Sequence, residues 1–298
     1  MDADKTNHSA ANAAGKPRRD AVSLTVLNGG VVRTREAIVV PKGSRRLVDI
    51  PALFGLIQHP SAGIGLFDTG YSTRYYAATR QFPYRLYRYV TPVKMRTEHD
   101  AVEQLARRGI AADDVRWIVL SHFDPDHIGG LCDFPRARVI CLRSAWSAVA
   151  GKRGWAALKS RLLPDLLPKD LEDRLQLIDA VTGPGEEPFA SCHDLFGDGT
   201  MRLVDLPGHA AGHLGALVRC DDGRDVLLVA DACWSRAGLR HGGGVVHRAL
   251  AHDREQQDAT YRLLGRLMRE RPDLVLIPSH CPEAASEWLP GGAWRFSP

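Results

Sequence analysis

Residues His122 to His127, within the stretch LSHFDPDHIGGL, place two histidines and two aspartates in six positions. Imidazole and carboxylate side chains together suit zinc, iron, manganese or cobalt. The carboxylates of Asp124 and Asp126 are two positions apart, and buried like charges repel each other unless a cation compensates them. This spacing therefore predicts a metal site and not an accidental cluster.

Three more residues of ligand type follow apolar runs that predict strands. His209 follows the run at 201–206, Asp231 ends DVLLVAD, and His280 ends DLVLIPSH. A single histidine at a strand end is more often an ordinary polar residue than a ligand. Repetition changes this interpretation, because a rigid scaffold holds binding residues on the loops that follow strands. We expect these residues and the 122–127 motif to form one site.

The elements that would position these residues alternate between strands and helices. Short apolar runs end at turn residues, and longer segments show the helical spacing of apolar residues. The segments 53–68 and 201–230 have the character of antiparallel hairpins, so we expect mixed sheets with helices outside them. The expected strands lie at 23–30, 52–60, 63–70, 114–122, 137–142, 200–209, 214–220, 225–231 and 273–280, and the expected helices at 97–110, 143–173 and 254–270.

The composition is that of an ordinary globular protein of 298 residues, with 44% hydrophobic and 25% charged residues. No apolar run reaches the roughly 20 residues of a membrane span, and the polar N-terminal stretch lacks the apolar core of a secretory signal. The six cysteines form no CxxC pair, which is typical of reduced thiols. We expect a disordered tail at 1–20, a single domain at 21–298 and a cytoplasmic location.

Charge and aromatic residues give weaker indications about partners. The net charge of +4 would suit an anionic small-molecule substrate, although most of this excess is ordinary surface charge. No basic stripe or nucleic-acid signature is present, so we expect neither nucleic acid nor a membrane as partner. The segment 71–89 holds six of the seven tyrosines among four arginines. We interpret it as a surface segment or a homodimer contact, with a lid over the pocket as the alternative.

The order and spacing of these motifs resemble the metallo-β-lactamase superfamily. Its HxHxDH signature is similar to HFDPDH at 122–127, and its next ligand loop is similar to LPGHAAGH at 206–213. The bridging aspartate of the family matches Asp231 in VADACW, its final histidine matches His280 in PSHC, and its early strand and turn match GLFDTG at 65–70. Within the superfamily, the layout is similar to the N-acyl homoserine lactone lactonases.

The resemblance implies an α+β fold, a four-layer αββα sandwich of two mixed β-sheets with a two-metal site between them. The two divalent ions are expected to be zinc, as is usual in the family. Asp231 would bridge both ions, and Asp68 would support the site from behind. The implied ligands are His122, Asp124 and His209 for the first ion, and Asp126, His127 and His280 for the second.

Two positions depart from the family pattern. Asp124 stands where the family has histidine, as a glutamate does in flavodiiron relatives. A carboxylate there would shift the preference from zinc toward iron or manganese, or its shorter side chain would fail to reach and leave one metal. Trp234 stands where the lactonases have a tyrosine that would stabilise the oxyanion. An indole N–H can donate a hydrogen bond in its place, although it is not acidic.

These residues predict a metal-dependent hydrolase that cleaves a lactone, an ester or a thioester. Metal ions lower the pKa of bound water toward neutrality and so supply hydroxide. Asp126 or Asp231 would orient the nucleophile and pass its proton to the leaving group, and Trp234 would assist. The alternatives are a di-iron redox enzyme that needs a separate electron donor, and a catalytically silent, metal-poor binding protein.

Overall fold

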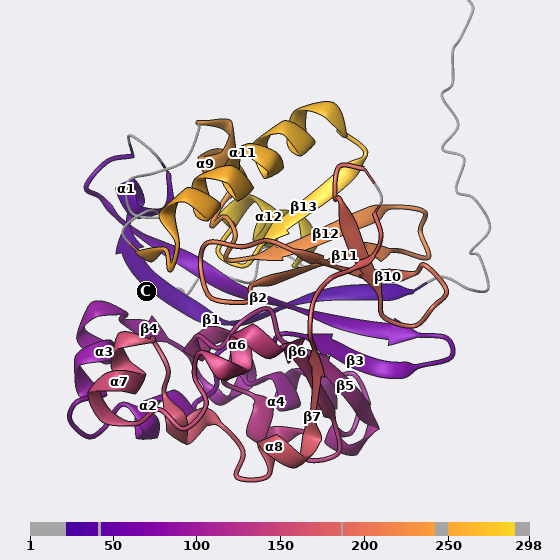
Figure 1. The fold of residues 1–298 in the computed structure, drawn as a ribbon. Helices are drawn as coiled ribbons and strands as arrows, with labels where there is room; N and C mark the ends of the chain where they lie inside the picture. The colour runs from indigo at the N-terminus through magenta and orange to yellow at the C-terminus, as the bar shows by residue number, and fades with distance from the viewer. Residues whose placement is uncertain (1–21, 41–42, 186, 242–249, 290–298) are drawn as a thin grey trace, which may run out of the picture.

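The computed structural model describes residues 22–40, 43–185, 187–241 and 250–289. The tail predicted at 1–20 lies outside these residues. The strands form two sheets that face each other, and helices cover the outer faces of both sheets (Figure 1). This arrangement confirms the mixed sheets that the sequence pattern predicts and the α+β sandwich that the family resemblance implies.

The first sheet contains seven strands. They are β1 (Ser23–Arg35), β2 (Leu47–His59), β3 (Gly63–Phe67), β4 (Val93–Lys94), β5 (Val115–Val119), β6 (Arg138–Leu142) and β7 (Leu175–Ile178). Their order across the sheet is β4-β1-β2-β3-β5-β6-β7. β1 and β2 form a long antiparallel hairpin, whereas β3, β5, β6 and β7 run parallel to one another.

The second sheet contains six strands. They are β8 (Gly183–Pro184), β9 (Ser191–Asp194), β10 (Met201–Asp205), β11 (Leu214–Arg219), β12 (Asp225–Ala230) and β13 (Leu274–Pro278). Their order is β13-β12-β11-β10-β9-β8, and only the pair β12 and β13 is parallel among the neighbours β10 to β13. This parallel pairing places the carboxyl ends of β12 and β13 at one edge, directly before Asp231 and His280.

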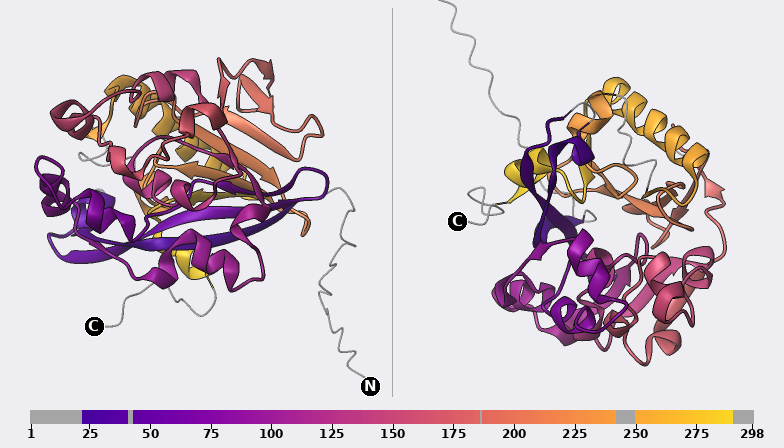
Figure 2. Two further views of the ribbon diagram at one scale, coloured as in Figure 1. Left: turned by 90° about the horizontal axis from the view of Figure 1, so that it is seen from below. Right: turned by 90° about the vertical axis from the view of Figure 1, so that its left-hand side faces the viewer.

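The helices lie outside the two sheets. They are α1 (Glu36–Val39), α2 (Arg74–Ala78), α3 (Arg85–Val90), α4 (Ala101–Ala106), α5 (Pro125–Ile128), α6 (Arg143–Ser147), α7 (Gly154–Lys159), α8 (Leu171–Arg174), α9 (Arg236–Arg240), α11 (Arg254–Glu270) and α12 (Pro282–Trp288). Figures 1 and 2 show α9 and α11 over the outer face of the second sheet. α12 follows the last strand of that sheet but contacts β1 and β2 of the first sheet, so this helix connects the two sheets.

The main core lies between the sheets. Buried apolar side chains from both sheets meet there: Val26, Phe54 and Phe67 from the first, and Leu228 and Ile277 from the second. A second apolar cluster joins the outer face of the second sheet to α11 through Val204, Leu227, Val229, Leu264 and Leu267. Within the described part of the chain, none of the helices has the length and apolar character that a membrane span requires.

Strand β1 continues past the glycines at which the sequence predicted a turn. Its pairing with β2 shifts register between Asn28 and Val31, and this β-bulge holds Gly29 and Gly30. A Cβ atom on Gly29 would lie 2.5 Å from the Cα atom of Gly70. Gly29 therefore permits a close approach between β1 and the turn after β3, and it does not end the strand.

The helix predicted at 97–110 is shorter than expected. A 3-10 turn occupies Thr97–His99, and α4 spans only Ala101 to Ala106. Asp100 between them has an extended backbone, and its carboxylate accepts hydrogen bonds at 2.7 Å from the backbone N–H and the hydroxyl of Thr73. This tertiary contact overrides the local helical spacing.

Candidate metal centre

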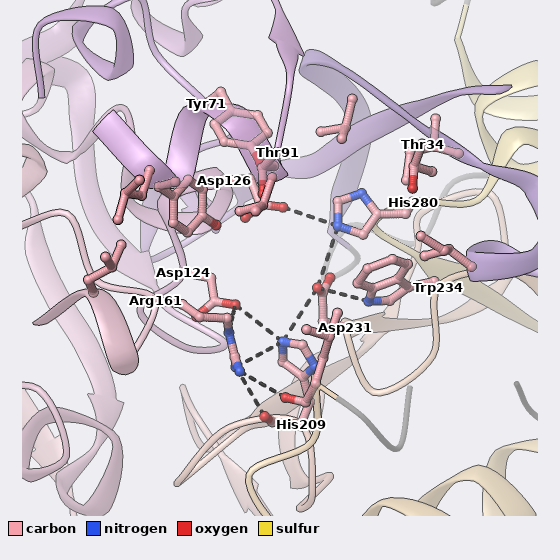
Figure 3. Close-up of a pocket in the computed structure, with 18 residues that line it drawn as sticks. Thr34, Tyr71, Thr91, Asp124, Asp126, Arg161, His209, Asp231, Trp234 and His280 are labelled. Atoms are coloured by element: carbon pink, nitrogen blue, oxygen red, sulfur yellow. Dashed lines mark hydrogen bonds and ion pairs between the residues drawn. The ribbon is translucent and has the colours of Figure 1, made fainter. Parts of the chain in front are cut away.

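The loops that follow β5, β10, β12 and β13 bring the predicted ligands together. Figure 3 shows those that line the pocket: Asp124, Asp126, His209, Asp231 and His280. The ligands form two buried groups, and within each group the ligand atoms lie within 4.8 Å of one another. The Asp231 group comprises Asp126, His127, Asp231 and His280, and the Asp124 group comprises His122, Asp124 and His209. Every residue for which the sequence predicts a metal role belongs to one of these groups.

The Asp231 group has the spacing of ligands around one ion. Atoms bound at about 2.0–2.2 Å to a tetrahedral zinc ion lie roughly 3.3–3.6 Å from one another. The Oδ2 atom of Asp126 lies 3.4 Å from Nε2 of His127 and 3.1 Å from Nε2 of His280. Oδ1 of Asp231 lies 3.4 Å from Nε2 of His127. These four side chains can therefore hold one ion between them.

The Asp124 group has similar spacing, and Asp231 of the other group lies next to it. The Oδ2 atom of Asp124 lies 3.5 Å from Nε2 of His122 and 3.4 Å from Nε2 of His209. Oδ2 of Asp231 lies 3.6 Å from Nε2 of His209 and 3.4 Å from Nε2 of His280. Asp231 thus faces both groups, as a bridging carboxylate must.

Two hydrogen bonds orient the imidazoles of the Asp231 group. Oδ2 of Asp68 is 2.7 Å from Nδ1 of His127, and the carbonyl oxygen of Pro51 is 2.7 Å from Nδ1 of His280. A proton on each Nδ1 donates to these acceptors and leaves Nε2 free for a metal. Asp68 also accepts hydrogen bonds from the backbone N–H and the hydroxyl of Ser121, both at 2.8 Å. Asp68 lies behind the site, where the resemblance placed it.

The backbone beside the site adopts conformations that most residues avoid. Asp68 has φ of 60° and Ala230, directly before Asp231, has φ of 46°. Left-handed backbone of this kind persists where surrounding contacts over-determine it, and it concentrates at functional sites. At Asp68 these contacts are the hydrogen bonds to Ser121 and His127.

The unpaired atoms of the two groups fit divalent cations. Nε2 of His122, Nε2 of His127 and Oδ1 of Asp231 are buried and have no hydrogen-bond partner among the described residues. Such atoms are costly unless something binds them. Burial would lower the pKa of His280, but the carboxylates of Asp231 and Asp126 raise it to about 10. Surroundings this negative attract a cation, and a divalent ion would displace the imidazole protons.

One residue at the site, Arg161, was not predicted from the sequence. Its Nε donates a hydrogen bond to Oδ2 of Asp124 at 2.6 Å (Figure 3). Burial would raise the pKa of Asp124, but the charges of Arg161 and His122 hold it well below its usual value. Asp124 is therefore an anion paired with a cation, which bears on the expected shift toward iron or manganese. The two residues lie 37 positions apart with no motif around Arg161, so no local signal could have found it.

Two further side chains hold Asp231 in position. Nε1 of Trp234 donates a hydrogen bond to Oδ2 of Asp231 at 3.1 Å, and the indole packs against the ring of His280 with 5.2 Å between centroids. Nε2 of His213 accepts a hydrogen bond from the backbone N–H of Asp231 at 3.3 Å. His213 belongs to neither group. The indole N–H of Trp234 faces the carboxylate of Asp231, so the expected contact with an oxyanion would compete with this bond.

A pocket of about 480 Å³ opens in front of the two groups. This volume is within the range of roughly 300–1,000 Å³ that is usual for small-molecule sites. The floor carries Asp124, Asp126, Arg161, His209, Asp231 and His280. The walls are mostly apolar and consist of Val32, Thr34, Ile38, Ile50, Tyr71, Leu86, Tyr87, Val90, Thr91, Leu158, Trp234 and Leu250.

Part of the tyrosine-rich segment 71–89 lines this pocket. Tyr71 and Tyr87 are buried and form part of its wall, and Tyr75 is fully buried behind them. The rings of Tyr71 and Tyr75 pack edge to face at 5.5 Å between centroids. The interpretation of the segment as a surface element is therefore wrong for these three residues, because their large apolar area makes them part of the core. Tyr89, in contrast, is 74% exposed.

The family model for the metallo-beta-lactamase superfamily matches residues 50–280 of this sequence. The chain belongs to this superfamily. The matched region begins in β2 and ends at His280, so it contains both ligand groups.

Known relatives within the superfamily are named as hydrolases. A probable metallo-hydrolase of Mycobacterium tuberculosis is 33% identical over 245 residues, which cover 76% of this chain and 74% of the relative. The N-acyl homoserine lactonase AttM of Azorhizobium caulinodans is 30% identical over 266 residues, which cover 88% of this chain and 94% of the relative. Both relatives align with most of this chain, which agrees with its place in the superfamily.

Solved structures of lactonases have the same fold. An N-acyl homoserine lactone hydrolase with the product N-hexanoyl-L-homoserine bound at its catalytic metal centre has a TM-score of 0.68 at 19% identity, with 90% of this chain and 96% of that chain covered. The dizinc quorum-quenching lactonase AidC has a TM-score of 0.61 at 18% identity, with 88% of each chain covered. At this identity the likeness establishes the sandwich fold.

Proposed function

We propose that this protein is a metal-dependent hydrolase that uses two divalent ions to cleave an acyl bond. The observation that carries the proposal is the pair of buried ligand groups, both faced by Asp231, on the floor of a largely apolar pocket. Such ions, when bound, lower the pKa of water to about 7 and so supply hydroxide at neutral pH. Zinc suits the mixture of imidazole nitrogen and carboxylate oxygen in both groups.

The carboxylates of the pocket can orient the water and transfer its proton. Asp126 and Asp231 both line it, so either can orient the attacking water, take up its proton and return that proton to the leaving alkoxide. Asp231 is the better fixed of the two, because Trp234 and His213 hold its side chain and its backbone N–H. The apolar walls exclude bulk water from the reacting bond.

The substrate class that we propose is a lactone with an apolar acyl chain. The relatives named N-acyl homoserine lactonases support the lactone, and the pocket supports the chain. Ile38, Ile50 and Val32 provide an apolar wall on one side of the floor, and Leu86 and Leu158 provide more apolar surface. Esters and thioesters require the same chemistry and are the natural comparison substrates.

Purified protein with its native metals tests this proposal. Elemental analysis should give two divalent ions per chain. The protein should open N-acyl homoserine lactones, with rates that rise as the acyl chain lengthens, and should act more slowly on an aryl ester and an acyl thioester. Chelation should abolish activity, and zinc should restore it. Absence of bound metal together with absence of hydrolysis would contradict the proposal, and two iron ions without hydrolysis would favour the redox alternative.

A further inference from the structure

Arg161 makes the two ligand groups chemically different. Its Nε donates to Oδ2 of Asp124 at 2.6 Å. The same oxygen lies 3.5 Å from Nε2 of His122 and 3.4 Å from Nε2 of His209. Oδ2 is thus the atom by which Asp124 completes its group, and the guanidinium already occupies one of its lone-pair directions. A cation bound by this group would have to share the oxygen with Arg161.

The guanidinium is anchored in this position. Nη1 donates to the carbonyl oxygen of Leu250 at 2.8 Å, and Nη2 donates to the carbonyl oxygen of His209 at 3.1 Å. Only 26% of the Arg161 side chain is exposed. The backbone of Arg161 has φ of 56°, a left-handed conformation that is retained only where other contacts fix it. Arg161 is therefore a fixed part of the floor of the pocket and not a mobile surface side chain.

The Asp231 group has no comparable cation. Among the described residues, no lysine or arginine forms an ion pair with Asp126 or Asp231, and both carboxylates face imidazoles. Arg161 is the only lysine or arginine among the described residues that line the pocket. Once a metal has displaced the imidazole protons, the Asp231 group offers it two negative charges, whereas the carboxylate of the Asp124 group remains paired with the permanent charge of Arg161.

We infer that Arg161 weakens cation binding by the Asp124 group, so that the protein holds its two metal ions with unequal affinity and fills the Asp231 group first. Like charges repel, and solvent screens this repulsion little in a buried site. A carboxylate oxygen that accepts a hydrogen bond from a guanidinium also donates less electron density to a metal. This inference rests on the proposed metal-dependent function.

Arg161 could also have the opposite effect and strengthen cation binding, because it orients Asp124. Partners that orient a ligand usually raise metal affinity, and their loss costs about 10- to 100-fold. Those partners accept a hydrogen bond from the ligand and are neutral or negative, as Asp68 and the Pro51 carbonyl are here. A guanidinium has the other sign of charge, so its repulsion of a divalent ion exceeds its orienting effect.

The pairing also changes the expected choice of metal. An aspartate in place of a neutral imidazole would favour harder ions such as iron or manganese. The Asp124–Arg161 pair, however, is neutral as a unit, as an imidazole is. The Asp124 group is then expected to accept zinc, but weakly.

Stepwise removal of metal from the native protein tests the inference. Protein that was purified with zinc is dialysed against increasing concentrations of a chelator, and the zinc that remains is counted by elemental analysis. Wild type should lose one equivalent at a chelator concentration at which it keeps the other. His209→Ala should lack the ion that is released first and keep the second.

Two neutral variants, Arg161→Met and Arg161→Gln, should hold the first-released ion to at least about tenfold higher chelator, since a hydrogen bond to a charged group accounts for about 1.5–3 kcal/mol. Arg174→Met is the matched control. Arg174 also donates to two backbone carbonyls and pairs with a carboxylate, that of Asp170, and it does not line the pocket. Circular dichroism establishes that each variant is folded. The control should release zinc as wild type does.

The outcomes separate this inference from the proposed function. A wild-type protein without bound divalent metal would overturn both. Simultaneous release of two ions from wild type, or earlier release from both Arg161 variants, would overturn the inference and leave the proposed function intact. Loss of the later-released ion in His209→Ala would overturn the assignment of the weaker ion to the Asp124 group.

Discussion

The two ligand groups lie side by side, yet the residues that contact them from outside differ in charge. In the Asp231 group, Asp68 and the Pro51 carbonyl hold two imidazoles from behind and leave their Nε2 atoms toward the site. In the Asp124 group, the hydroxyl of Ser121 lies 2.9 Å from Nδ1 of His122, but the carboxylate of Asp124 is contacted by the guanidinium of Arg161. The Asp124 group therefore has a lysine or arginine partner, which the Asp231 group lacks among the described residues.

This difference shows that a ligand set does not by itself define a metal site. Both groups present imidazoles and carboxylates at distances that suit zinc. The charge of the next layer of side chains decides how strongly each group attracts an ion, because buried charges interact over several ångströms with little screening. Variants that change one side chain of that layer, or Asp231 between the groups, test this difference.

Removal of Asp231, which faces both groups, should have the largest effect. Asp231→Ala should release both ions and reduce hydrolysis by about three orders of magnitude or more, because each metal contributes several kcal/mol to the transition state. Elemental analysis and the rate of lactone opening measure these two losses. Cys233→Ala is the control: this thiol is buried two positions away and belongs to neither group. Equal losses in the two variants would mean that the thiol is a ligand.

The support behind the Asp231 group should have the next largest effect. Asp68→Asn keeps the size of the side chain and tolerates the left-handed backbone, but it removes the negative charge that faces His127. The more tightly held ion should then be released at a chelator concentration about 10- to 100-fold lower than in wild type. Asp100→Asn is a matched control, because Asp100 is also buried and accepts hydrogen bonds from Thr73, which belongs to neither group. A tight ion that stays unaffected by Asp68→Asn would show that this support is not needed.

A histidine at position 124, which is the family's usual ligand, should not by itself give a stable site that binds zinc tightly. Asp124→His leaves Arg161 without its carboxylate, which should lower the free energy of unfolding by about 1.5–3 kcal/mol. The double variant Asp124→His/Arg161→Met removes the unpaired cation, so it should regain stability and bind zinc more tightly than wild type. Denaturant unfolding and zinc release measure both effects. Equal zinc retention in the single and double variants would show that Arg161 does not oppose the metal.

The sequence predicted which of these side chains come together because their signal is local. The four members at 122–127 share one motif, and the other members of the two groups lie shortly after the ends of strands. The antiparallel hairpins around β2 and β10 could likewise be predicted, since their strands are apolar runs that are close in sequence and separated by turn residues. The sandwich arrangement followed from the resemblance carried by these motifs.

Contacts between distant segments could not be predicted in this way. The partner of Asp124 lies after α7, in a stretch that has no motif. Asp100 shortens its helix because it binds Thr73, and Gly29 extends a strand because Gly70 lies against it. In each case the spacing along the chain favoured one structure, and a neighbour brought near by folding produced another.

The smallest effect is expected at Trp234, where two roles for the same N–H group predict different magnitudes. If the indole holds Asp231, Trp234→Phe removes one hydrogen bond of 3.1 Å to a carboxylate. A bond this long accounts for about 1.5 kcal/mol, the lower end of the range for a charged acceptor, or roughly tenfold in rate. If the indole donates to the developing oxyanion, the loss should be about 100- to 1,000-fold in kcat. We expect the smaller loss, together with somewhat earlier release of zinc, because Asp231 faces both groups and becomes less well fixed. Phenylalanine keeps a ring against His280, so the packing changes little. A loss of 100-fold or more in kcat with unchanged zinc retention would instead assign the N–H of Trp234 to the reacting substrate and not to the ligand that joins the two groups.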